Sequence, residues 1–357
     1  MKPVNFFGSR YWDLFEKRIT ETVNSNILGV LPPLRRLSVH LTNKCNLNCS
    51  YCNEKHSPNE MSSDIFQKLV KEYSEIGGGV LHITGGEPTC VKYLEDSIYY
   101  SALFPNVDLH LNTNMTQMLP LRCYSFIKRL KVSLDSHNSK YFDNLVGRKN
   151  SYQTVINNLV KIDTLPKELR PLVSITYTIT KENYKTIPEF LKMYYGTFIH
   201  FYAVFFSLYK GNNPRFVLDE NDERYFFENI VPKMNDIWKT MGDKESKALF
   251  EGSYFNGCFD NKERFPENKE VPCYINLSEL TINENGDIWN CSHLFRDGVG
   301  QVKSLNIKDM HLKDVFKQAK KNVSLFLSDK CLYGCNKKLI TFNEMVVKEI
   351  NRRKDEH

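Results

Sequence analysis

Three cysteines in one short segment have the clearest chemical potential in this sequence. Cys45, Cys49 and Cys52 form the pattern C-x3-C-x2-C, and thiolates at this spacing can converge on one metal centre. Structural zinc sites take four ligands, and His56 is the nearest further candidate. Iron–sulfur clusters are held by cysteine thiolates, and a set of three would leave one iron open to an outside ligand. The spacing favours an iron–sulfur cluster, with zinc and a chance group of core thiols as the alternatives.

A second motif, Thr84-Gly85-Gly86-Glu87-Pro88, follows a strand-like run. Two glycines let the backbone approach a ligand closely, and a carboxylate can accept hydrogen bonds from an ammonium group. A tight turn without a ligand is the alternative interpretation.

A second set of cysteines lies nearer the C-terminal end, in two pairs: Cys273 with Cys291, and Cys331 with Cys335. The first pair brackets an Asn285-Gly286 dipeptide between alternating apolar residues, which predicts a β-hairpin. Four thiolates satisfy a complete metal site, and a zinc ribbon is the simplest interpretation of this set on its own.

Three cysteines remain. Cys90 and Cys123 are expected in the core, and Cys258 is expected to be a thiol without a role unless a family resemblance gives it one. His293 follows Cys291 closely and is expected in a partly exposed turn.

Alternating elements must position these motifs. Six strand-like apolar runs cover residues 37–41, 80–84, 107–111, 130–134, 172–179 and 198–206. Helical patterns between them cover residues 64–76, 93–104, 152–162 and 187–195. This alternation predicts parallel strands with crossover helices. Six units fit either an open sheet or an open (β/α) barrel, short of the eight units that close one.

The pattern changes after residue 209. We predict a helix over 220–241, an irregular stretch over 256–272, the hairpin, and a last helix over 337–353. The predicted divisions are an N-terminal extension (1–36), an α/β region (37–209), a helical linker (210–272), a small α+β domain (273–345) and a tail (346–357).

Composition narrows the class of protein. The 357 residues carry 48 Lys and Arg against 42 Asp and Glu, which is too balanced to indicate nucleic-acid binding. A hydrophobic share of 41% excludes a disordered chain. We find no signal peptide and no apolar run near the roughly 20 residues that span a membrane. A cytoplasmic location is expected, where cysteines serve as metal ligands or redox groups rather than disulfides.

The order strand, C-x3-C-x2-C, helix, strand, GGEP resembles the radical S-adenosylmethionine (radical SAM) enzymes over about residues 37–206. The resemblance implies a partial (β/α)6 barrel with its active site at the C-terminal strand ends. It implies that Cys45, Cys49 and Cys52 hold a [4Fe–4S] cluster, whose open iron is chelated by the amino and carboxylate groups of SAM.

The same resemblance implies residues that contact SAM. The backbone of Tyr51 would lie near the adenine. Gly85, Gly86 and Glu87 would bond the methionine ammonium. The other implied contacts are Asn112 and Asn114 after the third strand, Ser133 with Asp135 after the fourth, and Arg148 at the SAM carboxylate.

The C-terminal part resembles the twitch domain, the short form of the SPASM extension, in which a hairpin and a following segment hold one auxiliary [4Fe–4S] cluster. Its implied ligands are Cys273, Cys291, Cys331 and Cys335. In some relatives a cysteine from the stretch around Cys258 enters the cluster or donates a hydrogen atom, which makes Cys258 the candidate donor.

The implied reaction begins with a one-electron donor such as flavodoxin or ferredoxin. SAM is cleaved to a 5′-deoxyadenosyl radical, which removes a substrate hydrogen atom, and the auxiliary cluster accepts the electron left on the substrate. We favour maturation of a ribosomally synthesised peptide, although residues 1–36 are too few for the leader-binding domain of many such enzymes. The alternatives are a dehydrogenase or epimerase of a sugar, aminocyclitol or nucleotide-like metabolite, and a non-enzymatic zinc-binding interaction module.

Overall fold

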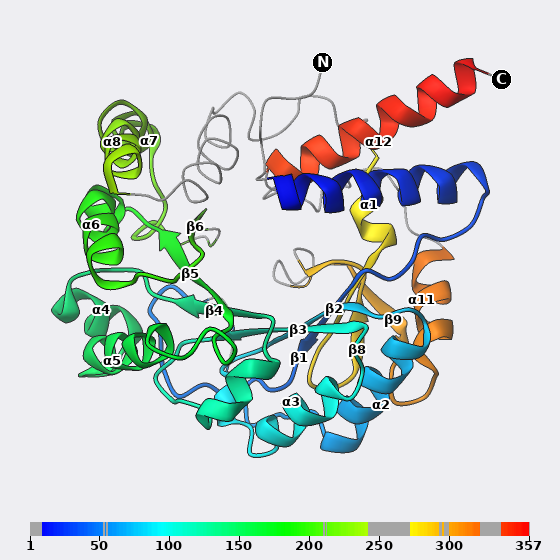
Figure 1. Ribbon diagram of the computed structural model, residues 1–357, viewed down its shortest axis with the longest axis horizontal. Coiled ribbons are helices and arrows are strands. Elements are labelled where there is room, and N and C mark those ends of the chain that lie inside the picture. The colour runs from blue at the N-terminus through cyan, green and yellow to red at the C-terminus, as the bar shows by residue number, and fades with distance from the viewer. Residues whose placement is uncertain are drawn as a thin grey trace.

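One curved sheet organises the part of the chain that the computed structural model describes, which is residues 9–52, 54, 56–209, 211, 213–241, 272–292, 295, 300–321 and 337–356. Its nine strands lie in the order β6-β5-β4-β3-β2-β1-β7-β8-β9 (Figure 1). The strands are β1 (Arg36–His40), β2 (Gly79–Thr84), β3 (Val107–Thr113), β4 (Arg129–Ser133), β5 (Leu172–Ile179), β6 (Ala203–Leu208), β7 (Glu279–Ile282), β8 (Asp287–Trp289) and β9 (Gln301–Asn306).

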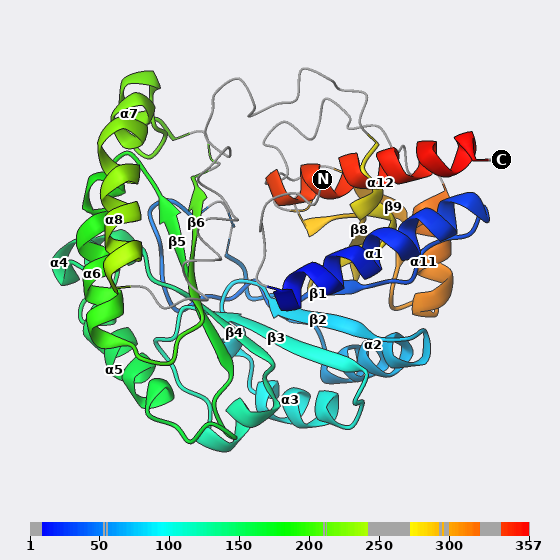
Figure 2. The ribbon, with the colours of Figure 1, turned by 45° about the horizontal axis from the view of Figure 1, so that its top comes forward.

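Helices lie on both sides of this sheet (Figure 2). Those described are α1 (Ser9–Ile27), α2 (Ser63–Glu75), α3 (Leu94–Ala102), α4 (Ser139–Val146), α5 (Ser151–Asp163), α6 (Ile187–Thr197), α7 (Glu220–Tyr225), α8 (Val231–Met241), α11 (Leu312–Lys321) and α12 (Lys337–Asp355). Helices α2 to α6 lie along the outer face of the curve, whereas α1 and α12 pack together across the other side at the β1 end (Figures 1 and 2).

The predicted parallel α/β arrangement is confirmed, because β1 to β6 pair as parallel neighbours in chain order. The prediction of a strand from residue 198 is wrong, since β6 begins at Ala203. Phe198 instead ends α6, and its ring stacks on Phe201 with centroids 4.4 Å apart. The apolar character of this segment thus reflects the packing of these two rings in the core and does not indicate a strand.

The predicted helix over 220–241 is interrupted. A π-helical segment, Phe226–Ile230, joins α7 to α8. Asp219 caps α7 with a capping box, because its side chain accepts the backbone N–H of Asp222 and the Asp222 side chain accepts that of Asp219.

The C-terminal hairpin continues the sheet of the first six strands. β7 and β8 pair in antiparallel fashion around the predicted Asn285-Gly286 turn, where Gly286 has a φ of +87°. β7 also pairs in parallel with β1, from Arg36 opposite Glu279 to Val39 opposite Ile282. The two parts of the chain therefore share one backbone hydrogen-bond network.

The two faces of the sheet differ in chemistry. The face under the outer helices carries buried apolar side chains such as Leu81, Ile83, Leu109 and Leu111. Parallel strands covered equally on both faces are apolar throughout, but here polar residues alternate with the apolar ones. We call the polar side, turned away from α2 to α6, the inner face.

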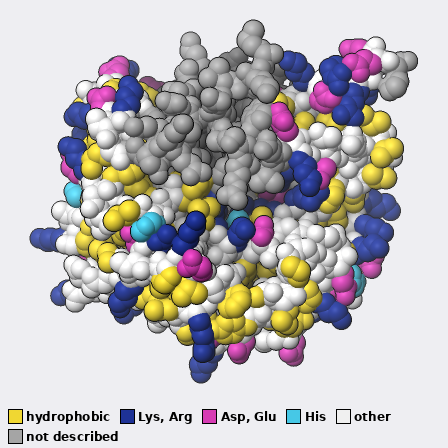
Figure 3. All heavy atoms as spheres, viewed as in Figure 1, with side chains coloured by type: hydrophobic (Ala, Val, Ile, Leu, Met, Phe, Trp, Pro, Cys, Tyr) yellow, Lys and Arg dark blue, Asp and Glu magenta, His cyan; other side chains and the backbone are white. Residues whose placement is uncertain are grey.

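The surface mixes both signs of charge, with Lys and Arg interspersed among Asp and Glu in the view of Figure 3. Among the described helices, none combines the length and the apolar character that crossing a membrane requires.

Candidate metal centre and active site

The loop that carries the first three cysteines follows β1 and packs against the Gly-Gly-Glu-Pro turn. The backbone N–H of Gly86 donates to Thr42 O, and that of Glu87 donates to Lys44 O, both at 2.8 Å. A Cβ at Gly86 would lie 2.2 Å from Lys44 O, and one at Gly85 would lie 2.3 Å from Thr42 O. Only glycine permits this approach, so the two motifs are one structural unit.

The same loop is held on its other side by the end of α4. Asn48 N donates to Val146 O at 3.0 Å, and Ser50 N donates to Leu145 O at 2.8 Å. Gly147 ends the helix with a φ of +70°, and a Cβ there would lie 2.9 Å from Asn48 O. The backbone between Cys45 and Cys52 is therefore fixed before any ligand binds.

The three thiols lie near one another. Cys45 and Cys49 are partly buried and Cys52 is exposed. Burial raises the pKa of Cys45 to about 11, with Glu87, Cys90 and Cys52 adding to the rise. Burial also raises the pKa of Cys49, and the charges of Asp135, Cys52 and Cys45 act in the same direction. A cationic centre would relieve this repulsion and displace the thiol protons.

The donor set suits a [4Fe–4S] cluster. A cubane binds each thiolate at a different iron, so its ligands need not converge on a point. Three cysteines on one pinned loop meet that requirement and leave the fourth iron without a protein thiolate.

Glu87 is buried and organises the strand ends beside the loop. Its Oε1 accepts the Thr89 hydroxyl at 2.7 Å and the Thr113 hydroxyl at 2.8 Å, while Oε2 accepts Asn114 N at 2.6 Å. Burial raises the pKa of this carboxyl, and these donors oppose the rise. Asn114 Nδ2 also donates to Asn46 Oδ1 at 2.8 Å, which ties the end of β3 to the cysteine loop.

Tyr51 and Asp135 form a second tie. The Tyr51 hydroxyl donates to Asp135 Oδ2, and Thr178 N donates to Oδ1, both at 2.5 Å. Asp135 is 1% exposed, and burial raises the pKa of its carboxyl to about 6. The structure thus brings together Tyr51 and Asp135, which sequence patterns place in separate segments.

The remaining expected SAM contacts differ in burial: Asn112 is partly buried, whereas Ser133 and Arg148 are exposed. Asn112 lies on the inner face, where its buried Oδ1 interacts with the His82 ring. Ser133 is exposed at the end of β4. Arg148 has an exposed side chain directly after Gly147, and its backbone N–H donates to Asp143 O at 3.1 Å.

The second set of cysteines is described only in part. Cys273 and Cys291 are 3% and 4% exposed on either side of the hairpin. Cys331, Cys335, Cys258 and His293 lie outside the described residues.

Lys320 lies beside this buried pair. Its Nζ donates to Glu279 O at 2.6 Å and to Asn290 Oδ1 at 3.0 Å. Burial lowers the pKa of this amine to about 7, while the charges of Cys291, Glu279 and Cys273 oppose the fall. The sequence does contain a signal for this lysine, because it continues the buried helical stripe Leu312, Val315, Phe316, Ala319.

Cys90 does not lie in the core, where it was expected. Cys123 is fully buried in the core, as predicted, but Cys90 is only partly buried. Its sulfur accepts the backbone N–H of Asn46, and its charge acts on Cys45. Cys90 therefore lies beside the cysteine loop rather than in the core.

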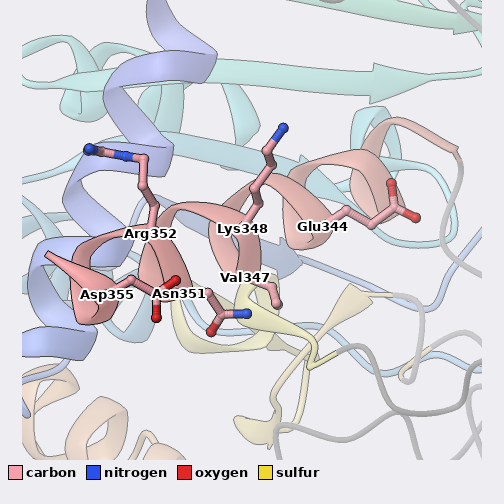
Figure 4. Close-up of a pocket in the computed structure, with 6 residues that line it drawn as sticks. All are labelled: Glu344, Val347, Lys348, Asn351, Arg352 and Asp355. Carbon is pink, nitrogen blue, oxygen red and sulfur yellow. The ribbon is translucent and has the colours of Figure 1, made fainter.

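A shallow hollow lies along one side of α12 (Figure 4), lined by Glu344, Val347, Lys348, Asn351, Arg352 and Asp355. All six side chains come from this one helix, and none belongs to the cysteine motifs. We do not assign it to the active site.

Comparison with known proteins gives the same assignment as the motif geometry. Residues 39–194 match the Radical SAM superfamily. GTP 3′,8-cyclase of Clostridium perfringens is 27% identical over 165 residues, which cover 40% of this chain and 51% of that protein. The chain spans about half the length of such curated relatives.

Two solved structures share the fold over most of the chain. Streptococcus suis SuiB bound to its precursor peptide SuiA has a TM-score of 0.61 at 17% identity, covering 84% of this chain and 68% of that one. Native anSMEcpe with bound AdoMet and the Cp18Cys peptide has a TM-score of 0.59 at 17% identity, covering 90% and 100%. The family match over β1 to α6 assigns this part of the chain to the Radical SAM superfamily, and the two structures share its fold.

Proposed function

We propose that this radical SAM enzyme modifies a ribosomally synthesised peptide and carries one auxiliary [4Fe–4S] cluster. The main support for a second cluster is the burial of both Cys273 and Cys291 on either side of the hairpin. Buried cysteines beside a buried lysine form a polar group that an apolar core does not need. Cys331 and Cys335 are the proposed remaining ligands.

The peptide substrate is supported by the fold comparison. SuiB and anSMEcpe are both solved with a peptide bound, and their likeness to this chain extends over 84% and 90% of its residues. A short, exposed substrate segment suits an active site on the inner face of an open sheet.

When bound, the first cluster and SAM supply an electron and a 5′-deoxyadenosyl radical that removes a hydrogen atom from the substrate. In the proposal, Cys45, Cys49 and Cys52 hold the cluster. Gly85 and Gly86 let the turn pack against the cysteine loop, and the proposed contact with the methionine part of SAM comes from this turn and from Glu87, which accepts Asn114 N. The other proposed SAM contacts are Tyr51, Asn112, Ser133, Asp135 and Arg148.

The second cluster has a different proposed role. Four protein thiolates leave no open iron, so its proposed function is outer-sphere electron transfer. A one-electron donor such as flavodoxin or ferredoxin is the proposed reductant of the first cluster.

A small-metabolite dehydrogenase or epimerase is the second candidate, favoured by the sequence similarity to GTP 3′,8-cyclase. Epimerisation requires a hydrogen-atom donor, for which Cys258 is the candidate. In that case Cys258→Ala abolishes the epimerised product and still forms 5′-deoxyadenosine. Membership of an enzyme superfamily argues against a zinc-binding interaction module.

Iron analysis and turnover test the main proposal. Anaerobically reconstituted protein should bind about eight iron atoms per chain, and about four when Cys45, Cys49 and Cys52 are all replaced by Ala. The triple variant should lose SAM cleavage, and SAM cleavage by that variant contradicts the assignment. Incubation of the wild-type enzyme with SAM, a reductant and short peptides encoded beside its gene should yield a peptide of altered mass.

A further inference from the structure

Helix α11 contacts the neighbourhood of the second cysteine pair on its buried side and solvent on its other side. On the buried side, Lys320 Nζ donates at 3.2 Å to the carbonyl of Asn290, the residue before Cys291. On the exposed side, Lys313, Lys317 and Lys321 follow one another at intervals of four residues. Residues at this spacing are neighbours on a helix surface, so the three lysines form one exposed stripe.

The exposed stripe carries an excess of positive charge. Asp314 is the one acidic residue of α11, so three exposed lysines against one aspartate leave a formal charge of +2 on this side. Among the described residues, none forms an ion pair with any of the three lysines. Unpaired charge of one sign attracts proteins of the opposite sign and speeds their association.

An exposed apolar segment lies beside the same helix. Its large side chains are 36% to 72% exposed and belong to Ile27, Leu28, Val30 and Leu31, where α1 ends. The loop that follows passes next to α11 in both ribbon views (Figures 1 and 2). It reaches β7 where Arg35 N donates to Ser278 O, one residue before the Glu279 carbonyl that Lys320 contacts. Exposed apolar residues with charged residues beside them are typical of a protein-docking surface.

We propose that the lysine stripe of α11 and the apolar segment 27–31 form a docking face for a small acidic one-electron carrier protein. The inference rests on the proposed function for the source of the electron, which is the auxiliary cluster. A cluster that has accepted an electron from the substrate has to pass it on before the next turnover. One electron then moves from the reduced cluster to the oxidised carrier, and no bond forms or breaks.

The position of α11 suits this transfer. The helix is about 10 Å across, and Lys320 connects it directly to the backbone beside Cys291. A carrier on the lysine stripe is therefore separated from the proposed cluster ligand by little more than one helix.

Binding of acidic carriers to the reconstituted full-length enzyme tests the face. We expect saturable binding of oxidised flavodoxin or oxidised ferredoxin by surface plasmon resonance, with an affinity that falls as the ionic strength rises. The α11 variant combines Lys313→Gln, Lys317→Gln and Lys321→Gln, which remove the charge and keep helix propensity. This variant should bind about tenfold more weakly, with circular dichroism to establish folding.

The control variant combines Lys140→Gln, Lys161→Gln and Lys192→Gln, which remove the same charge from exposed positions on α4, α5 and α6. It should bind like the wild type. Equal weakening in the two triple variants overturns the face, as does the absence of saturable binding with both carriers. Leu28→Ser, at a position that is 72% exposed, should also weaken binding, and unchanged binding there overturns the role of the apolar segment. Self-association of the enzyme that the α11 variant abolishes makes a second copy of the chain the occupant and overturns the carrier.

Electron transfer and iron content separate the docking face from the proposed function. In stopped-flow mixing at low carrier concentration, reduced wild-type enzyme should reduce oxidised flavodoxin about tenfold faster than the α11 variant does, with about eight iron atoms per chain in both. Equal rates at this iron content overturn the route through α11. If the wild type holds only about four iron atoms, the auxiliary cluster is overturned, and carrier binding that depends on the α11 lysines then supports the docking face with a different electron source.

Discussion

The Tyr51 hydroxyl and the Asp135 carboxylate are joined by a hydrogen bond of 2.5 Å across 84 positions of sequence. Because Asp135 also accepts the backbone N–H of Thr178 at 2.5 Å, one buried carboxylate connects the cysteine loop to the ends of β4 and β5. The position of the cysteines therefore depends on a residue far from the cysteine motif.

Replacing Tyr51 by Phe removes the donor and leaves Asp135 Oδ2 buried without it. A buried acceptor that loses its partner costs about 1–3 kcal/mol, so the free energy of unfolding of the apoprotein should fall by that amount. Denaturant unfolding followed by circular dichroism measures it. Tyr141→Phe is the matched control, because this hydroxyl donates at 3.3 Å to the surface residue Glu182. Tyr141→Phe should change the free energy of unfolding by less than about 0.5 kcal/mol. Equal losses in the two variants would contradict the structural role of the Tyr51–Asp135 hydrogen bond.

Gly86→Ala should displace the cysteine loop, because the added Cβ would lie 2.2 Å from Lys44 O. We expect the reconstituted variant to bind about four fewer iron atoms per chain, the content of one cluster. Gly196→Ala is the control, since a Cβ at this α6 position has nothing within 4 Å. It should retain full iron content and gain about 0.5–1 kcal/mol of stability. Wild-type iron content in Gly86→Ala would show that the contact does not control the loop.

The parallel strands were predictable because short apolar runs alternate with capped helices. Ser62, for example, accepts Ile65 N at the start of α2, as its sequence position suggests. Helix α1 was not predicted, because Ile19 and Val23 are buried against Phe342 and Val346, more than 300 positions away. Local patterns do not contain such a partner.

The candidate site was predictable to a similar degree. The cysteines and the Gly-Gly-Glu-Pro turn have recognisable spacing, and the hairpin has its Asn285-Gly286 turn. The roles of Asp135 and Lys320 depend on which loops meet in space. The alternation of His82, His110 and Lys131 with apolar neighbours was visible, but only the strand register shows that they share a face.

The buried His110 should make the protein less stable in acid. Its pKa is about 3 in the folded chain against 6.5 when unperturbed, so below pH 6.5 the unfolded state binds a proton that the native state does not. The free energy of unfolding therefore falls as the pH drops from 6.5 toward 3, by up to about 1.4 kcal/mol per pH unit, and His110 causes no such loss above pH 6.5. His110→Gln should flatten the dependence of unfolding free energy on pH in this window. His56→Gln, at an exposed position, should keep the wild-type slope, and an unchanged slope in His110→Gln would contradict the prediction.

Lys320 should tune the proposed auxiliary cluster, because below its pKa of about 7 the buried amine is a cation that acts on both Cys273 and Cys291. A nearby positive charge stabilises the reduced, more negative state of a cluster, so Lys320→Met should lower the reduction potential of that cluster. Losing about 1.4 kcal/mol of electrostatic stabilisation of the reduced cluster lowers its potential by about 59 mV for a one-electron couple. Redox titration followed by electron paramagnetic resonance measures the shift, with circular dichroism to establish folding. Lys317→Met, at an exposed position on the same helix, should leave the potential unchanged. A folded Lys320→Met variant with the wild-type potential would contradict the electrostatic role of this lysine.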